Sequence, residues 1–212
     1  MKSFSSICIL GVAVGLGAAQ TSPASSSGSS ALSIAAEFQA KLDRAHSVSN
    51  DLTNGTACKE ILLIAARGSN EPGNMGEATG PNICTRLTKI YGARIGCQGI
   101  SAADGYSASG MDISKAKGTS DSAIAGGVKM FNLAQSKCPS SLKLFTGYSQ
   151  GAAVMHGAIP QLSADLKKTL VAGVLFGDTR NTQDKGQIPD YPKDQVLILC
   201  APDDYFFIWK RL

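Results

Sequence analysis

The chain has 212 residues, of which 43% are hydrophobic, enough to bury the core of one globular domain with little room for a second. The formal net charge is +4, and the 20 Lys and Arg residues are scattered rather than gathered into a stripe, which argues against a nucleic-acid partner. After the first 19 residues, no apolar run approaches the roughly 20 residues that cross a bilayer. We therefore expect one domain that neither binds nucleic acid nor spans a membrane.

The N-terminal residues have the features of a secretory signal. Lys2 precedes an apolar run over residues 7–16, and small residues follow up to Ala19. We predict a signal peptide over residues 1–19 and a secreted, extracellular protein, with a membrane anchor as the alternative interpretation. Residues 20–50 are a Ser-rich leader that ends in a predicted amphipathic helix over 31–45, and the folded domain is expected over residues 51–212.

Hydrophobic patterning predicts alternating strands and helices in this domain. The first candidate strands cover residues 60–65, which lead into a loop at Arg67, and residues 90–95. A loop rich in Gly, Ser and Ala follows over 99–118, and then a helix over 119–136. The remaining predicted elements are a strand over 142–146, a helix that runs to about Leu162, and strands over 170–176 and 196–199. Such alternation is typical of a parallel sheet with helices on both faces, so the predicted fold class is α/β.

Residues 147–151, with the sequence Gly-Tyr-Ser-Gln-Gly, are the most informative stretch of the chain. An apolar run precedes them, and Ala152 opens a predicted helix after them. This is the layout of a nucleophile elbow, a strained strand-to-helix turn that presents a serine hydroxyl at the carboxyl edge of a sheet. Glycines flank the serine because side chains there would clash with neighbouring backbone. The pattern predicts that Ser149 is a nucleophile.

Five cysteines remain once Cys8 is removed with the predicted signal. They are Cys58, Cys84, Cys97, Cys138 and Cys200. An odd number cannot pair completely within one chain. Zinc binding would be the competing use of these residues, but no C-x-x-C pair or histidine cluster accompanies them, so we expect no metal site.

Several motifs, in a fixed order, resemble those of the fungal cutinases, which are small serine esterases of the α/β-hydrolase class. The resemblance covers residues 58–204 and rests on Cys58 and on residues 66–76, 138–139, 147–153, 176–181, 188–192 and 200–204. It implies a three-layer α/β-hydrolase fold with a small central parallel sheet. It also implies ester hydrolysis through an acyl-serine intermediate, without a metal or an organic cofactor.

The resemblance assigns roles to individual residues. Ser149 matches the nucleophile, and Ser69 and Gln150 match the oxyanion-hole residues, with the backbone N–H after the nucleophile as one donor. Asp204 matches the acid that orients the catalytic histidine. The simpler interpretations are a helix cap for Ser69, a surface amide for Gln150 and an exposed loop acid for Asp204. The resemblance also implies two disulfide bonds, Cys58–Cys138 and Cys84–Cys97.

The chain departs from the family pattern after Asp204. In this fold class the catalytic histidine follows the acid, but no histidine follows here, and Phe207 stands where the family has the cysteine partner of Cys200. His156 lies seven residues after Ser149, about 10 Å along the same predicted helix, so we expect a packing or surface residue rather than a base. The other histidine, His46, lies outside the family motifs.

The resemblance implies a secreted monomer that hydrolyses cutin polyester, short acyl esters and triglycerides. Without a histidine base, the chain as written is expected to be impaired. An acetylxylan esterase, which shares the fold, is the alternative activity. The alternative from a different class is a non-catalytic, truncated or mis-spliced product, because the terminal run over residues 206–209 looks unlike the family.

Overall fold

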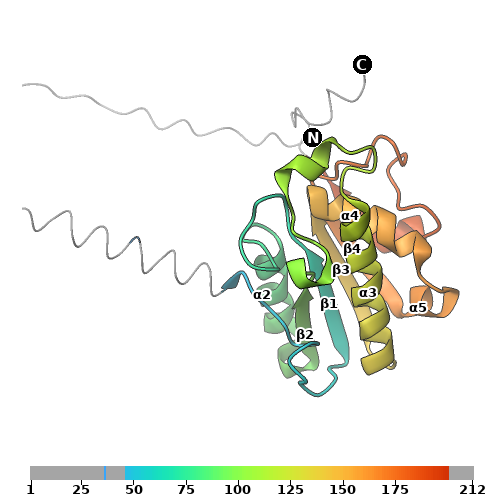
Figure 1. Ribbon diagram of the computed structural model, residues 1–212. Coiled ribbons are helices and arrows are strands. Elements are labelled where there is room, and N and C mark those ends of the chain that lie inside the picture. Colours follow the sequence, from blue (N-terminus) through green and yellow to red (C-terminus); the bar gives the residue numbers. More distant parts are fainter. Residues whose placement is uncertain (1–35, 37–45, 201–212) are drawn as a thin grey trace, which may run out of the picture. The chain divides into compact units, whose positions relative to one another are not determined.

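The computed structural model describes residue 36 and residues 46–200 (Figure 1). The predicted signal peptide, nearly all of the predicted helix over 31–45, and Asp204 therefore lie outside the described residues. Residues just before the predicted start of the domain already belong to the folded body, because Asn50 pairs with Gln98 and Ser49 Oγ donates a 2.8 Å hydrogen bond to the Cys97 carbonyl.

A single parallel sheet lies at the centre of the fold, with strand order β2-β1-β3-β4-β5. The strands are β1 (Ile61–Ala66), β2 (Ile95–Gly99), β3 (Leu142–Tyr148), β4 (Leu170–Phe176) and β5 (Val196–Leu199). All residues of β1 and β2 are buried, as expected of strands in a parallel sheet. Because all five strands run in the same direction, the loops that follow them meet at one edge.

Helices lie on both faces of the sheet. They are α2 (Gly80–Tyr91), α3 (Asp121–Lys137), α4 (Gln150–Ala158) and α5 (Ala164–Thr169), with short 3-10 segments between elements. The larger core joins side chains such as Ile64 and Phe145 of the sheet to Phe131 of α3 and Val154 of α4. The smaller core lies on the opposite face, where α2 packs on β1 and β2. Figure 1 shows α2 apart from α3, α4 and α5.

Most predicted elements are confirmed, but the strand predicted over residues 90–95 is wrong. Residues 80–91 form α2, and the strand is β2. Pro81 suits the first turn of a helix, and Gly92 ends the helix with a φ of 62°. Ile90, whose apolar character suggested a strand, lies in the last turn of α2 and is 71% exposed. Helix α5, which begins after a Ser163 cap, was not predicted.

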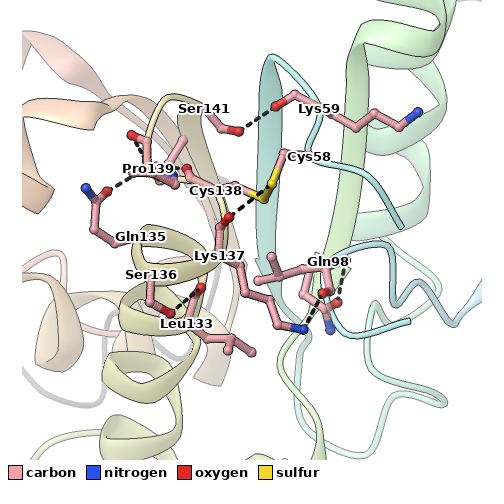
Figure 2. The surroundings of a disulfide bond; sticks show 12 residues. Cys58, Lys59, Gln98, Leu133, Gln135, Ser136, Lys137, Cys138, Pro139 and Ser141 are labelled. Atoms are coloured by element: carbon pink, nitrogen blue, oxygen red, sulfur yellow. Dashed lines mark hydrogen bonds between the residues drawn. A yellow bond between two sulfur atoms is a disulfide. The ribbon is translucent and has the colours of Figure 1, made fainter. Parts of the chain in front are cut away.

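Both disulfide bonds that the resemblance implies are present. Cys58–Cys138 joins the segment before β1 to the end of α3, and Cys84–Cys97 joins α2 to β2. Figure 2 shows that Ser141 Oγ donates a hydrogen bond to the Lys59 carbonyl beside the first bridge. The Cys58–Cys138 bridge lies at the start of β1 and β3, the edge of the sheet away from the nucleophile elbow. Among the described residues, no helix is long and apolar enough to cross a bilayer.

Candidate active site

Ser149 lies at the turn between β3 and α4 in a strained backbone conformation. Its φ is 52° and its ψ is −114°, a combination that a non-glycine residue adopts only when the surrounding structure enforces it. The Ser149 N–H donates a 2.9 Å hydrogen bond to the Phe176 carbonyl at the end of β4, and the Ser149 carbonyl accepts one of 3.0 Å from Ala152 N. The half-buried serine is thus fixed between a strand end and the first turn of a helix.

The two flanking glycines are needed for close backbone contacts. A Cβ on Gly147 would lie 2.6 Å from the Gly151 carbonyl oxygen, and a Cβ on Gly151 would overlap the Ala66 carbonyl at the end of β1. In both cases the obstacle is backbone, which cannot rotate away as a side chain could. The elbow therefore packs directly on the end of the neighbouring strand.

The loop after β1 carries Ser69, and hydrogen bonds from Arg67 hold this loop in place. The buried Arg67 guanidinium donates hydrogen bonds to the carbonyls of Glu71, Ile100 and Ser107, and burial lowers its pKa. The Glu71 carboxylate folds back to accept a hydrogen bond from Gly68 N. The Ser69 hydroxyl is buried and has no hydrogen-bond partner among the described residues, so it is available to donate to a group outside the protein.

A second loop, over residues 106–110, connects the Ser69 loop with the elbow. Asn70 N donates to the Ala108 carbonyl at 2.9 Å. Gln150, which is fully buried, donates through Nε2 to the Ser109 carbonyl at 2.8 Å. Gln150 is therefore not a surface amide. It opens α4, where backbone N–H groups of the first turn have no intrahelical acceptor, and the positive end of the helix dipole favours negative charge.

His156 is buried in α4 between two carboxylates. Its Nε2 lies 2.8 Å from Asp178 Oδ2, and its Nδ1 lies 2.7 Å from Asp184 Oδ2. An ionised carboxylate only accepts hydrogen bonds, so both contacts are satisfied when each ring nitrogen carries a proton. Both ring nitrogens face these carboxylates, so neither is directed at Ser149. His156 is thus a buried residue in contact with two carboxylates, where the sequence suggested simple packing or surface exposure.

Arg180 completes the cluster around His156. It forms two hydrogen bonds to Asp184, of 3.0 and 2.8 Å, and one of 2.9 Å to the Ala116 carbonyl. Burial pushes the pKa of Asp184 up, but the Arg180 guanidinium and the His156 ring outweigh it and lower that pKa. The cluster joins α4, the loop after β4 and the segment around Ala116. The sequence motif over 176–181 contained two of its members, but no pattern of spacing linked them to His156.

The structure thus brings the elbow and the loops of Ser69 and Ser109 together at the carboxyl edge of the sheet. Asp204, the predicted acid, lies outside the described residues. His46 is exposed and lines a cavity beside the start of α2 with Glu77 and Pro81. The site as described contains a positioned hydroxyl and candidate oxyanion donors, which suits acyl transfer once a base is supplied.

Comparisons with known proteins identify a family model and relatives that this chain resembles. The chain matches the family model for cutinase over residues 57–207. Probable cutinase 3 of Aspergillus clavatus is 45% identical over 157 residues, which cover 74% of this chain and 72% of the relative. Cutinase 3 of Emericella nidulans is 45% identical over 165 residues, which cover 77% of this chain and 73% of the relative.

Solved structures give the same result for the fold. A Trichoderma reesei cutinase, solved in complex with a phosphonate inhibitor, superposes with a TM-score of 0.64 at 27% identity, covering 86% of this chain and 77% of that one. The catalytic core domain of acetyl xylan esterase from Trichoderma reesei superposes with a TM-score of 0.56 at 17% identity, covering 69% and 84%. The second likeness concerns the fold alone.

Proposed function

This chain belongs to the cutinase family of carboxylic ester hydrolases, and we propose that it carries a serine esterase site for cutin polyester and short acyl esters, with Ser149 as the nucleophile. The observation that carries the proposal is the backbone of Ser149, which is held at a φ of 52° and a ψ of −114° between two glycines that packing requires. Such strain is retained where it presents a reactive side chain.

The chemistry proceeds in two half-reactions. The Ser149 oxygen bonds to the ester carbonyl carbon while a base takes its proton, and the carbonyl oxygen becomes an oxyanion. Collapse of this tetrahedral intermediate expels the alcohol, which receives the proton from the base, and leaves an acyl-serine. Water then attacks the acyl carbon by the same sequence, which releases the carboxylic acid and restores the hydroxyl.

The oxyanion is the species that the site stabilises. The backbone N–H of Gln150 at the start of α4 and the hydroxyl of Ser69 are the proposed donors. The buried Ser69 hydroxyl supports this role, because a buried polar group without a protein partner is costly unless it serves another purpose. Cutin polyester and short acyl esters are proposed as substrates on the strength of family membership.

The proton acceptor is the missing part of the site. The 212 residues contain two histidines, and both ring nitrogens of His156 already face carboxylates. His46 belongs to no motif of the site. We therefore infer that these 212 residues turn over esters slowly. We also infer that Asp204 can orient a catalytic histidine only when the chain contains a histidine after residue 204.

A kinetic comparison tests this inference. Residues 20–212 would be assayed with p-nitrophenyl butyrate beside the same chain extended by a C-terminus that contains a Cys and a His, with Ser149→Ala in the extended chain as the control. Loss of the base costs on the order of a million-fold in turnover in a comparable hydrolase. Equal turnover of the two chains would show that the base lies within residues 20–212 and would contradict the inference.

Two rival functions can be separated by the same proteins. Acetylxylan esterase activity is consistent with the shared fold. If the chain has this activity, the extended chain should hydrolyse acetylated xylan faster than cutin or butyrate esters. A non-catalytic product predicts that even the extended chain fails to hydrolyse any of these esters. The proposal predicts hydrolysis of cutin and butyrate esters by the extended chain.

We place the protein outside the cell. Its two disulfide bonds suit an oxidising compartment, and residues 1–19 have the pattern of a signal peptide. Sequencing of the protein recovered from the culture medium should begin at Gln20. Recovery of the chain only inside the cell would contradict this placement.

A further inference from the structure

Part of one sheet face has no cover among the described residues. On the side of α2, the side chains Ile83 and Leu87 pack over β1 and β2. The adjoining part of the same face belongs to β4 and β5, and we call it the uncovered face. It consists of Ala172, Val174, Leu197 and Leu199, and it borders Leu144, which packs at the margin of the core under α2.

The uncovered face differs sharply from the opposite face of the sheet. Leu197 is 57% exposed and Leu199 is 43% exposed, whereas Phe145 and Leu175 on the other face are buried. Parallel sheets are normally covered on both faces, because their strands are apolar on both sides. An apolar groove of about 230 Å³ lies along the uncovered face and is lined by residues that include Leu63, Leu87, Leu144, Val174 and Leu197.

We propose that the C-terminal segment of this chain, residues 201–212, folds back from β5 and packs its apolar run over residues 205–209 on the uncovered face. The run is Tyr-Phe-Phe-Ile-Trp, five consecutive aromatic or aliphatic residues. Burial stabilises a run of this kind, because it removes apolar surface from water.

The position of β5 supports this occupant. β5 is an edge strand of the sheet and ends at Leu199, so the segment begins beside the uncovered face. Pro202 and Asp203 are residues that favour a turn. Neighbouring strands lie about 4.8 Å apart, so β3 is roughly 10 Å from β5, and the residues between Leu199 and Tyr205 can span about 20 Å.

The N-terminal segment enters the domain at the opposite edge. Asn50 pairs with Gln98 of β2, and β2 is the strand farthest from β5 in the sheet. A segment that precedes Asn50 must cross the sheet to reach β4 and β5. This placement favours the C-terminal segment over the N-terminal one, and the test below distinguishes both from a second copy of the chain.

The fluorescence of Trp209 reports on the proposal directly, because Trp209 is the only tryptophan of the chain. We expect native residues 20–212 to show blue-shifted tryptophan emission and several-fold weaker acrylamide quenching than the urea-unfolded chain. Leu197→Lys, in the uncovered face, should shift the emission towards the unfolded value and raise the quenching. Ile90→Lys is the matched control, because Ile90 is 71% exposed on α2, and it should change neither.

A second variant keeps the test decisive if Leu197→Lys fails to fold. A chain that ends at Cys200 should keep its secondary structure, bind a hydrophobic dye more strongly and exchange the amide hydrogens of β4 and β5 faster. Native emission that matches the unfolded chain would overturn the proposal. So would a dimer that Leu197→Lys converts to a monomer, because a second copy would then cover the face. None of these readouts depends on ester hydrolysis, so they are independent of the proposed function.

Discussion

Ser69 carries a buried hydroxyl oxygen and Ser141 is a buried residue, but their hydroxyls differ in their partners. Ser69 Oγ has none among the described residues, whereas Ser141 Oγ donates to the Lys59 carbonyl. Ser69→Ala should therefore leave the free energy of unfolding nearly unchanged. It should lower the turnover of the extended chain by about 100- to 1000-fold, as expected for loss of one oxyanion donor. Urea unfolding and p-nitrophenyl butyrate kinetics measure the two effects.

Ser141→Ala is the matched control for this prediction. Removal of its hydrogen bond should destabilise the protein by about 1 kcal/mol and leave turnover unchanged, because Ser141 lies at the other edge of the sheet. If Ser69→Ala destabilised the protein and left turnover intact, Ser69 would have a structural role instead.

At the scale of elements, the cluster around His156 attaches α4 to the loop after β4. His156→Leu would leave Oδ2 of the buried Asp178 without its His156 partner, and a buried polar group left without a partner typically costs about 1–3 kcal/mol. Urea unfolding at neutral pH should show a loss of this size. The double variant His156→Leu/Asp178→Leu should recover part of it, and a double variant less stable than the single one would argue against this contact.

A lower pH should weaken the attachment of α4 to the loop after β4, because it protonates Asp184. The pKa of Asp184 is lowered in the folded state because Arg180 and His156 outweigh the effect of burial. Its contribution to stability is therefore complete above the ordinary carboxyl pKa, near 3.9, and is lost as the pH falls through the lower, folded value. Asp184→Asn should be less stable at pH 7 and should lose less stability between pH 5 and pH 3. Parallel pH profiles of the two proteins would contradict this assignment.

Element prediction from the sequence succeeded where hydrophobic runs were isolated by turns. β4 and β5 were predicted at their observed residues because apolar side chains fill each run. It failed at α2, where the periodic residues Ile83 and Leu87 were overlooked and the apolar pair at 90–91 was given a strand. Local pattern did not distinguish an exposed helix end from a strand.

At the scale of the whole molecule, two disulfide bonds close loops of very different length. Cys58 and Cys138 are 80 residues apart, and Cys84 and Cys97 are 13 apart. The chain-entropy model assigns about 4.5 kcal/mol to the longer loop and about 3 kcal/mol to the shorter one. Replacing Cys58 and Cys138 by serine should therefore lower the unfolding free energy more than replacing Cys84 and Cys97. Equal losses in urea unfolding would show that loop length does not decide their contributions.

The residues of the proposed site came partly from local sequence and partly from the family resemblance, and their roles remain predictions. Ser149 and its glycines form a contiguous motif whose strain is encoded locally, and Ser69 and Gln150 followed from the family resemblance. The cluster of His156, Asp178 and Asp184 was not predicted, because its members are 22 and 28 residues apart in sequence and meet only when β4 pairs with β3. The partial cover of the sheet likewise depends on tertiary packing rather than on local pattern.

The central claim is that the strained Ser149 is the nucleophile, and covalent labelling tests it most directly. The extended chain would be treated with a fluorophosphonate, digested and mapped by mass spectrometry, with Ser149→Ala treated in parallel. We predict one adduct per chain, on the peptide that contains Ser149, and none on the variant. An adduct on another serine, or no adduct on an extended chain that hydrolyses p-nitrophenyl butyrate, would contradict the claim.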